Sequence, residues 1–110
     1  MELTSKQRKV LEKAAHALEP VVIVGQNGVT DALVDMTKAQ LSQHELIKVK
    51  FNEFKEEKQS LSRQLAEQCD ATLVRIIGNV AILYRESDEE DKRTYAKQLA
   101  KAVSKVRADI

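Results

Sequence analysis

Two glycines three positions apart are the residues of this chain best suited to bind an anion. They enclose the tetrapeptide Gly25-Gln26-Asn27-Gly28, which follows the β-branched run Val21 to Val24 and precedes Thr30, a favourable helix N-cap. Glycines allow positive φ and let a phosphate approach without meeting a Cβ, and the free N–H groups and dipole at a helix start favour negative charge. The tetrapeptide is therefore a candidate phosphate-binding loop.

The same G-x-x-G pattern has competing interpretations. A tight turn is the favoured one on the tetrapeptide alone, because glycines at this spacing arise often by chance. The loop is not a Walker loop, since no Gly-Lys-Ser/Thr follows, and the third glycine of a dinucleotide fingerprint is missing. In KH modules a G-x-x-G loop clamps about four nucleotides of a nucleic-acid backbone. Asp31, just inside the helix, would repel a phosphate held very close to it.

A basic stripe is expected near the N-terminus. Lys6, Lys9 and Lys13 are spaced three and four apart along one helix face, with Arg8 nearby. The net charge is only +1, from 18 basic and 17 acidic residues, but five of the acids lie together in Glu86 to Asp91. Taking those five away leaves 12 acids against 18 basic residues, a surplus of six. That surplus suits an anionic partner; the alternative is a solvated helical surface.

Catalytic and metal-binding groups are not indicated. His16 and His44 stand near predicted helix ends, without a Ser, Cys or carboxylate at the spacing of a nucleophile or ligand set. The single cysteine, Cys69, excludes an internal disulfide framework and a zinc site built on several thiolates. It shares an apolar face with Leu61 and Leu65, so we expect a buried, inert thiol. We expect no enzyme activity, no metal, no cofactor and no small-molecule substrate.

Length and composition favour one soluble domain. A chain of 110 residues, 43% hydrophobic and 32% charged, matches a single globular core. No apolar run approaches the roughly 20 residues of a membrane span, and no secretory signal is indicated, so a cytoplasmic monomer without membrane contact is expected. Aromatic residues make up only 4%, which disfavours base stacking on a sheet of aromatics and favours recognition of backbone or shape.

The spacing of apolar residues, together with the positions of capping residues and glycines, predicts alternating helices and strands. Thr4 and Gln7 form a capping box at the start of the first helix. The β-branched run 21–24 predicts a strand buried on both faces or central in a sheet. Gly78-Asn79 predicts a hairpin turn with glycine first. The expected elements are helix 5–18, strand 21–24, a helix from Thr30 to near His44, strand 46–51, helix 56–69, strands 72–77 and 80–85, and a final helix marked by Tyr95, Leu99, Ala102, Val103 and Val106.

These elements predict an α/β fold. Helices alternating with strands imply a parallel, right-handed β-α-β unit. The order α-β-α-β-α-β-β gives a four-stranded mixed sheet packed with three helices, plus a C-terminal helix. In strand 46–51, Leu46, Lys48 and Lys50 fall on one side, predicted to be wet and basic.

Several segments together resemble the YhbY-type proteins of the CRM (chloroplast RNA splicing and ribosome maturation) domain family. The resemblance covers about residues 3 to 86 and implies a compact two-layer domain akin to the C-terminal domain of translation initiation factor three. It also implies RNA binding and association with precursors of the large ribosomal subunit. The segments that carry it are Thr4-Ser5-Lys6-Gln7-Arg8, Ala15-His16, Leu18, Pro20-Val21-Val22, Val24 to Thr30, His44 to Lys50, Ile76-Ile77-Gly78 and Leu83-Tyr84-Arg85.

The resemblance implies that RNA is contacted by the loop and the first helix. Family loops often carry lysine after the first glycine, whereas this chain has Gln26, which replaces a charge contact with an amide hydrogen bond. Lys48 and Lys50 fit the RNA surface and a solvated strand equally well. The candidate RNA-binding residues are Gly25, Gln26, Asn27, Gly28, Lys6, Arg8, Lys9, Lys13, Thr30, Lys48 and Lys50.

The C-terminal part extends past the resemblance. We expect a CRM-like RNA-binding domain in residues 1–86, followed in 87–110 by an acidic linker and an amphipathic helix. That helix either docks on its own domain, which is favoured, or binds a partner. The expected function is binding of ribosomal RNA or large-subunit precursors during ribosome assembly. The alternative is a non-enzymatic adaptor that binds proteins through the C-terminal helix or the sheet face.

Overall fold

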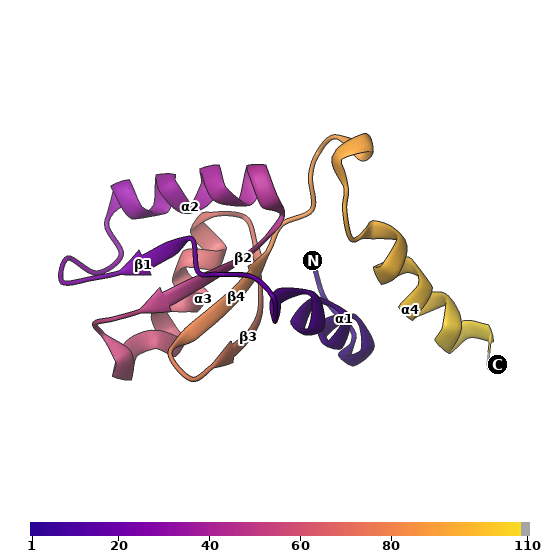
Figure 1. The fold of residues 1–110 in the computed structure, drawn as a ribbon, viewed down its shortest axis with the longest axis horizontal. Coiled ribbons are helices and arrows are strands. Elements are labelled where there is room, and N and C mark those ends of the chain that lie inside the picture. The colour runs from indigo at the N-terminus through magenta and orange to yellow at the C-terminus, as the bar shows by residue number, and fades with distance from the viewer. Residues whose placement is uncertain (109–110) are drawn as a thin grey trace.

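A four-stranded sheet with the strand order β1-β2-β4-β3 forms the centre of the fold (Figure 1). The computed structural model describes the backbone of residues 1–108 and the side chains of residues 1–102. In chain order the elements are α1 (Ser5–Ala15), β1 (Val22–Val24), α2 (Asp31–His44), β2 (Leu46–Phe51), the 3-10 turn η1 (Lys55–Glu57), α3 (Lys58–Gln68), β3 (Thr72–Ile77), β4 (Val80–Tyr84), the 3-10 turn η2 (Glu90–Lys92) and α4 (Ala96–Ala108).

The strand pairing confirms the expected α/β fold with a mixed sheet. β1 pairs parallel with β2 across the α2 crossover, and β4 pairs antiparallel with both β2 and β3. The β3–β4 hairpin closes through Gly78, whose φ of 58° is the positive value expected of a glycine-first turn. The element order is the predicted one.

The first helix begins as predicted and ends earlier than predicted. The Thr4 Oγ1 accepts from the Gln7 backbone N–H at 3.1 Å, and the Gln7 side chain accepts from the Thr4 N–H at 2.9 Å, so the capping box is complete. The helix ends at Ala15 and not near residue 18. The chain turns there because the Leu18 N–H donates to the Ala15 carbonyl at 2.9 Å.

The prediction that the first strand is central or buried on both faces is wrong. β1 is three residues long and lies at one edge of the sheet, paired only with β2. Val22 and Val24 point into the core, whereas Ile23 is 54% exposed. A run of β-branched residues does not distinguish these cases, because strand order is decided by pairing with distant segments.

One face of the sheet packs against α2 and α3. The side of α2 predicted to be apolar is buried there: Leu33, Val34, Thr37 and Leu41. α3 contributes Leu65 and Ala66 to this core, and Cys69 follows directly after the end of α3. All three residues are buried. This larger core fixes α2 against the sheet, so the loop between β1 and α2 is anchored at both ends.

A second, smaller core lies on the opposite face. Leu11 and Ala15 of α1 and Leu99 of α4 pack there with Leu46 and Tyr84 of the sheet. Leu46 is therefore buried, which corrects the predicted wet side of strand 46–51: only its Lys50 end is open. The Gln7 side chain joins the two helices by donating to the Leu99 carbonyl at 3.2 Å.

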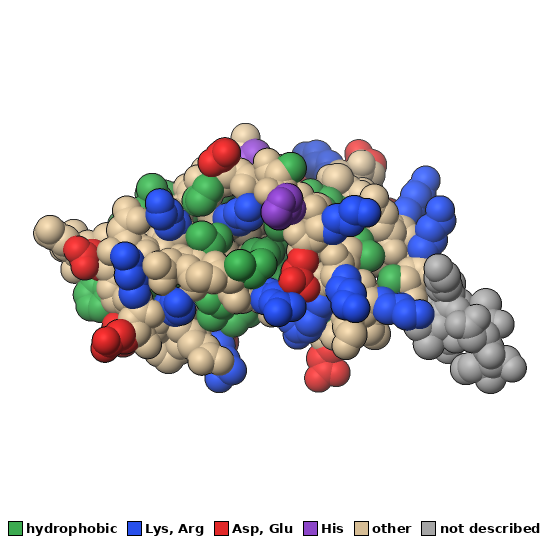
Figure 2. Space-filling model, turned by 60° about the horizontal axis from the view of Figure 1, so that its bottom comes forward, with side chains coloured by type: hydrophobic (Ala, Val, Ile, Leu, Met, Phe, Trp, Pro, Cys, Tyr) green, Lys and Arg blue, Asp and Glu red, His purple; other side chains and the backbone are tan. Residues whose placement is uncertain are grey.

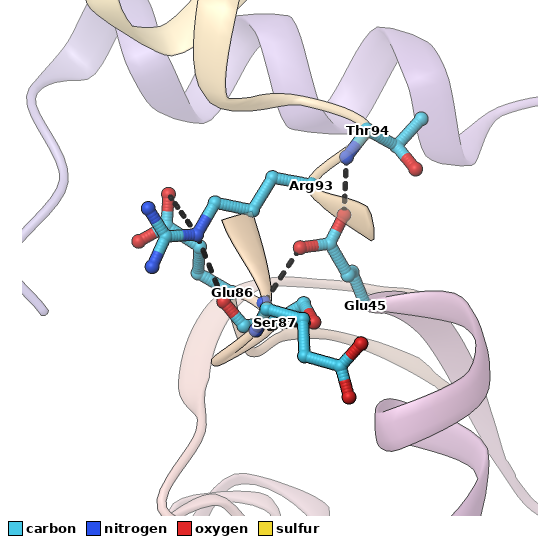
Figure 3. Close-up of polar contacts among 6 residues, drawn as sticks. Glu45, Glu86, Ser87, Arg93 and Thr94 are labelled. Carbon is cyan, nitrogen blue, oxygen red and sulfur yellow. Dashed lines mark hydrogen bonds and ion pairs between the residues drawn. The ribbon is translucent and has the colours of Figure 1, made fainter. Parts of the chain in front are cut away.

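The acidic linker is held by a buried carboxylate (Figure 3). Glu45, at the end of α2, is 3% exposed and accepts from the backbone N–H groups of Ser87 and Thr94, each at 2.7 Å. Arg93 closes the linker on itself by donating to the Ser87 carbonyl at 2.8 Å. This arrangement places the linker at the C-terminal end of α2, whereas the G-x-x-G loop precedes its N-terminal end.

The final helix docks on its own domain through its described side chains. The Tyr95 ring, just before α4, packs edge-on against Tyr84 at a centroid distance of 6.2 Å, and Leu99 is buried. The predicted apolar residues Val103 and Val106 lie outside the described side chains. Within residues 1–108, no helix has the length and apolar character needed to cross a membrane.

Candidate nucleic-acid interface

The G-x-x-G loop is a closed turn between β1 and α2. The Gly28 N–H donates to the Gly25 carbonyl at 3.0 Å, and Gly28 has a φ of 68°, in the left-handed region that favours glycine. Two residues later Thr30 caps α2, because its Oγ1 accepts from the Leu33 N–H at 3.1 Å. The predicted turn and the predicted cap are both present.

The two glycines have different surroundings. A Cβ at Gly28 would lie 3.4 Å from the ring of Phe54, in a backbone conformation that side chains rarely adopt. A Cβ at Gly25 would meet no atom within 4 Å. The fold itself therefore does not require glycine at position 25. The absence of a side chain there leaves the backbone open to a ligand.

Backbone donors are available around this opening. The N–H groups of Gln26 and Asn27 have no acceptor among the residues that the structure describes, and neither do those of Asp31 and Ala32 in the first turn of α2. Such N–H groups, together with the helix dipole, favour an anion. The carboxylate of Asp31 is exposed beside them and opposes very close approach of a phosphate to the helix axis.

A cavity of about 590 Å³ lies beside the loop, and no local sequence pattern predicted it. It is lined by Gln26, by the half-exposed ring of Phe54, and by the segment between β2 and α3. Its lining includes Glu53, Glu56 and Glu57 against the single Lys55. Because this side of the loop is acidic, a phosphate is favoured on the loop's other sides.

The basic residues of α1 do not form one uniform stripe. Lys6, Lys9 and Lys13 are exposed as predicted. Arg8 instead turns toward β3, where its Nη1 donates to the Leu73 carbonyl at 3.0 Å and to the Val74 carbonyl. Its side chain therefore joins α1 to the sheet.

The loop and α1 lie at different ends of the sheet (Figure 1). α1 packs over the Leu46 end of β2, and the loop follows β1 beside the Phe51 end. These ends are separated by roughly 16 Å, the rise over the five steps from Leu46 to Phe51. The structure thus does not bring the predicted loop and basic helix into one compact site, and a ligand that contacts both must cross the sheet face.

Lys48 and Lys50 have different environments. The Lys48 Nζ donates to the Leu18 carbonyl at 2.9 Å and lies 3.4 Å from the His16 carbonyl, so it satisfies the end of α1. Lys50 is exposed on the same face, one step nearer the loop. Sequence alternation placed both on this face and could not separate their roles, since the partners of Lys48 depend on how α1 folds back.

An exposed row of side chains crosses the sheet at the level of Lys50. The strand register aligns Ile23 with Lys50, Lys50 with Val80, and Val80 with Ile77. Ile23 and Ile77 are 54% and 55% exposed. Figure 2 shows a face on which basic side chains outnumber acidic ones, with apolar side chains among them. This apolar and basic row was missed from the sequence, because its members come together only through the strand order.

Other candidate groups remain outside the interface. His16 and His44 are exposed. Cys69 is buried as expected, and its burial raises the pKa of its thiol. Among the described side chains of residues 1–102, no cluster of three or more His, Cys, Asp or Glu is suited to a metal ion.

Comparisons with known proteins assign the fold and this loop to one family. The CRS1/YhbY (CRM) domain model matches residues 3–85. The chain is 39% identical over 88 residues to an RNA-binding protein of Haemophilus influenzae, covering 79% of this chain and 89% of the relative. It is 38% identical over 106 residues to a probable RNA-binding protein of Methanocaldococcus jannaschii, covering 94% of this chain and 78% of the relative, an alignment that extends past residue 85 into α4.

A solved structure has the same fold. The solution structure of a hypothetical protein from Staphylococcus aureus matches with a TM-score of 0.71 at 33% identity. The match covers 84% of this chain and 98% of that protein. From the family match over residues 3–85, the curated relatives and this structure, the chain belongs to the CRS1/YhbY (CRM) domain family.

Proposed function

We propose that this protein binds ribosomal RNA in precursors of the large ribosomal subunit and contacts the RNA backbone through the G-x-x-G loop. The observation that carries the proposal is the open backbone of the loop: no neighbour stands where a Gly25 Cβ would be, and the Gln26 and Asn27 N–H groups have no acceptor among the described residues. The names of two relatives, an RNA-binding protein of Haemophilus influenzae and a probable RNA-binding protein of Pseudomonas aeruginosa, support the ligand class.

The candidate residues divide into contacts and supports. The loop N–H groups and the Gln26 amide bind phosphate oxygens by hydrogen bonds. Lys50 is exposed on the sheet face near the loop and supplies positive charge there. The exposed lysines of α1 supply charge to RNA that has crossed the sheet face; they are Lys6, Lys9 and Lys13. Thr30, Arg8 and Lys48 use their polar groups within the protein, and they hold α2, β3 and the end of α1 in place.

Recognition then rests on backbone and shape. Phe51 and Tyr84 are buried in the two cores, so neither offers a stacking surface. The Phe54 ring is half-exposed beside the loop, but it lines the acidic cavity and packs against Gly28. Contacts to phosphate carry no sequence information by themselves. We therefore propose that specificity comes from the folded RNA, and that the protein acts by binding and not by catalysis, without a cofactor.

Fluorescence anisotropy tests this proposal. Labelled fragments of large-subunit ribosomal RNA are titrated with the full chain at several salt concentrations, beside the variant Gly25→Asp. Three to five phosphate contacts give a log–log slope of about −2 to −4. Gly25→Asp places a negative charge at the opening without a clash in the fold, and we expect it to lose most of the affinity.

The matched control is Ala39→Asp, which adds the same charge on the exposed side of α2, away from the loop. It should bind like the wild type. Equal RNA affinity of Gly25→Asp and the wild type would mean that the loop is only a turn and does not contact the RNA. No RNA binding by the wild type would reject the proposed function.

A protein-binding adaptor is the second candidate, and the exposed row on the sheet supports it. Ile23 and Ile77 present apolar surface that a protein partner would cover. The final helix supports it less, since Leu99 is already buried against α1. An apolar partner contact would weaken little with salt, whereas RNA binding weakens steeply.

A further inference from the structure

A basic groove runs along the outer edge of β3, between α1 and α3. We call it the β3-edge groove; its cations are Arg8, Lys58, Arg63 and Arg75. It encloses about 540 Å³, and no Asp or Glu is among the residues of the described chain that line it. Of these four cations, only Arg8 is among the candidate residues predicted from sequence, because the other three come from a helix and a strand that meet only in the fold.

Contacts within the protein hold these cations in place. Arg8 is fixed by the Leu73 and Val74 carbonyls, and the Lys58 Nζ donates to Asn79 Oδ1 at 3.1 Å. These acceptors are neutral, so they position the charges without cancelling them. Arg75 lies 3.2 Å from Glu12 and remains 62% exposed, and the Arg63 side chain is exposed. Glu12 therefore partly balances the charge of Arg75, whereas the other three cations have no ion pair among the described residues. A groove that keeps three such charges suits a polyanion.

The backbone at this edge favours a phosphate strand over an added peptide strand. β3 is the outer strand of the sheet, where an extended peptide could pair. However, its pairing with β4 shifts between Leu73 and Arg75, and Arg8 occupies the carbonyls at this bulge. An added peptide strand would need evenly spaced backbone N–H and C=O groups on β3 that are free to form hydrogen bonds. Phosphate groups need only the positively charged side chains.

The groove and the G-x-x-G loop are at opposite edges of the sheet. The loop follows β1, and three strand spacings of about 4.8 Å, roughly 14 Å in all, separate β1 from β3. The exposed row with Lys50 at its second position crosses the sheet between them. A nucleic acid that leaves the loop across this row arrives at the groove.

We infer that the β3-edge groove is a second phosphate-binding site, which takes the backbone of the same RNA beyond the nucleotides on the loop. The inference rests on the proposed RNA-binding function and extends it. It requires an RNA longer than the roughly four nucleotides that a G-x-x-G loop clamps. Short RNA uses the loop alone, and longer RNA uses both sites.

The test compares two double variants with equal loss of charge. Lys58→Gln/Arg63→Gln removes two groove cations, and Lys38→Gln/Lys97→Gln removes two exposed lysines on α2 and α4. Each full-length variant is titrated into labelled RNA of about four and about twenty nucleotides, after thermal melting has shown that it is folded. Arg63→Gln alone repeats the test without disturbing the Lys58–Asn79 hydrogen bond.

We expect the groove variant to lose roughly tenfold in affinity for the long RNA, with a salt slope shallower by about one to two units, and to bind the short RNA unchanged. The control variant should lose much less. Equal losses in both variants, or no loss in the groove variant, would overturn the inference while leaving loop binding intact. Binding of poly-glutamate that depends on the groove cations, with RNA binding unaffected, would overturn it in favour of a peptide site. Failure of the wild type to bind any RNA would instead reject the proposed function.

Discussion

The phenyl ring of Phe54 packs against Gly28, so that a Cβ on Gly28 would stand 3.4 Å from Phe54 Cε2. Both residues have positive φ, 56° for Phe54 and 68° for Gly28. The contact couples the G-x-x-G loop to the turn that follows β2. The shape of the loop is therefore set partly from outside it, through Gly28, whereas Gly25 is free of such a constraint.

This contrast predicts that alanine affects stability at Gly28 and RNA binding at Gly25. Gly28→Ala should lower the free energy of unfolding by about 1–2 kcal/mol, because it places a Cβ in the left-handed region beside the Phe54 ring. Gly25→Ala should leave stability within about 0.5 kcal/mol and still weaken RNA binding, since the methyl group occupies the opening. Urea unfolding and anisotropy titrations measure the two effects. A stability loss at Gly25 as large as at Gly28 would contradict this account.

Signals carried by neighbouring residues were predictable from sequence. The Thr4–Gln7 capping box, the Thr30 cap and the Gly78 hairpin each depend on residues within four positions of one another, and all are present. The alternation of helices and strands fixed the fold class for the same reason. The loop could be located because strand, glycines and cap follow one another directly.

Features that depend on distant segments were not predictable. From sequence, Arg8 was predicted to be part of the exposed basic surface of the first helix. Its side chain instead donates to the carbonyl of Leu73, which lies 65 positions away. Lys48 likewise donates to a carbonyl 30 positions before it. The edge position of β1 and the β3-edge groove follow from the strand order, which local propensity does not determine.

Cys69 should be unreactive in the folded protein. Its side chain is 0% exposed, and burial raises the pKa of the thiol, so little thiolate forms at neutral pH. We expect a thiol-reactive dye to label the native chain only at the rate of unfolding and to label it rapidly in denaturant. The control is the same chain in guanidinium at the same pH. Rapid labelling under native conditions would mean that α3 opens more easily than its packing indicates.

Glu45→Gln should release the linker. The amide can accept only through its oxygen, so one of the N–H groups of Ser87 and Thr94 loses its acceptor along with the charge. We expect a loss of about 1.5–3 kcal/mol in the free energy of unfolding, the range for hydrogen bonds to charged groups. Hydrogen exchange at Ser87 and Thr94 should accelerate. Glu90→Gln, at an exposed carboxylate of the same linker without an ion pair among the described residues, serves as control and should change neither quantity.

Leu99→Ala tests whether α4 is part of the folded core. Leu99 is 3% exposed and packs with Leu11 and Tyr84, so its truncation should cost about 2–5 kcal/mol. Gln98→Ala, at the exposed neighbouring position, should cost no more than about 0.5 kcal/mol. The Leu99 variant should keep its RNA affinity where it is folded, because the loop lies at the other end of the sheet. Equal stability of the two variants, measured by thermal melting, would mean that α4 is not docked in solution.

Tyr84 makes the fold sensitive to alkaline pH. Burial raises the pKa of the Tyr84 phenol above its usual range, and the carboxylates of Glu45 and Glu86 raise it further. The unfolded chain releases this proton near pH 10, while the native state retains it. Above that pH the unfolded state therefore binds fewer protons than the native state, and stability falls as pH rises.

Tyr84→Phe removes the titrating group and isolates its contribution to the loss of stability at high pH. The Tyr84 hydroxyl is buried without a hydrogen-bond partner among the described residues, so its loss should change stability by less than about 1 kcal/mol at neutral pH. Urea midpoints at about pH 8 and about pH 11 should then fall less for the variant than for the wild type. Part of the fall will persist, because burial also raises the pKa of Tyr95. Parallel pH profiles for the two proteins would show that the Tyr84 phenol ionises in the native state as readily as in the unfolded chain.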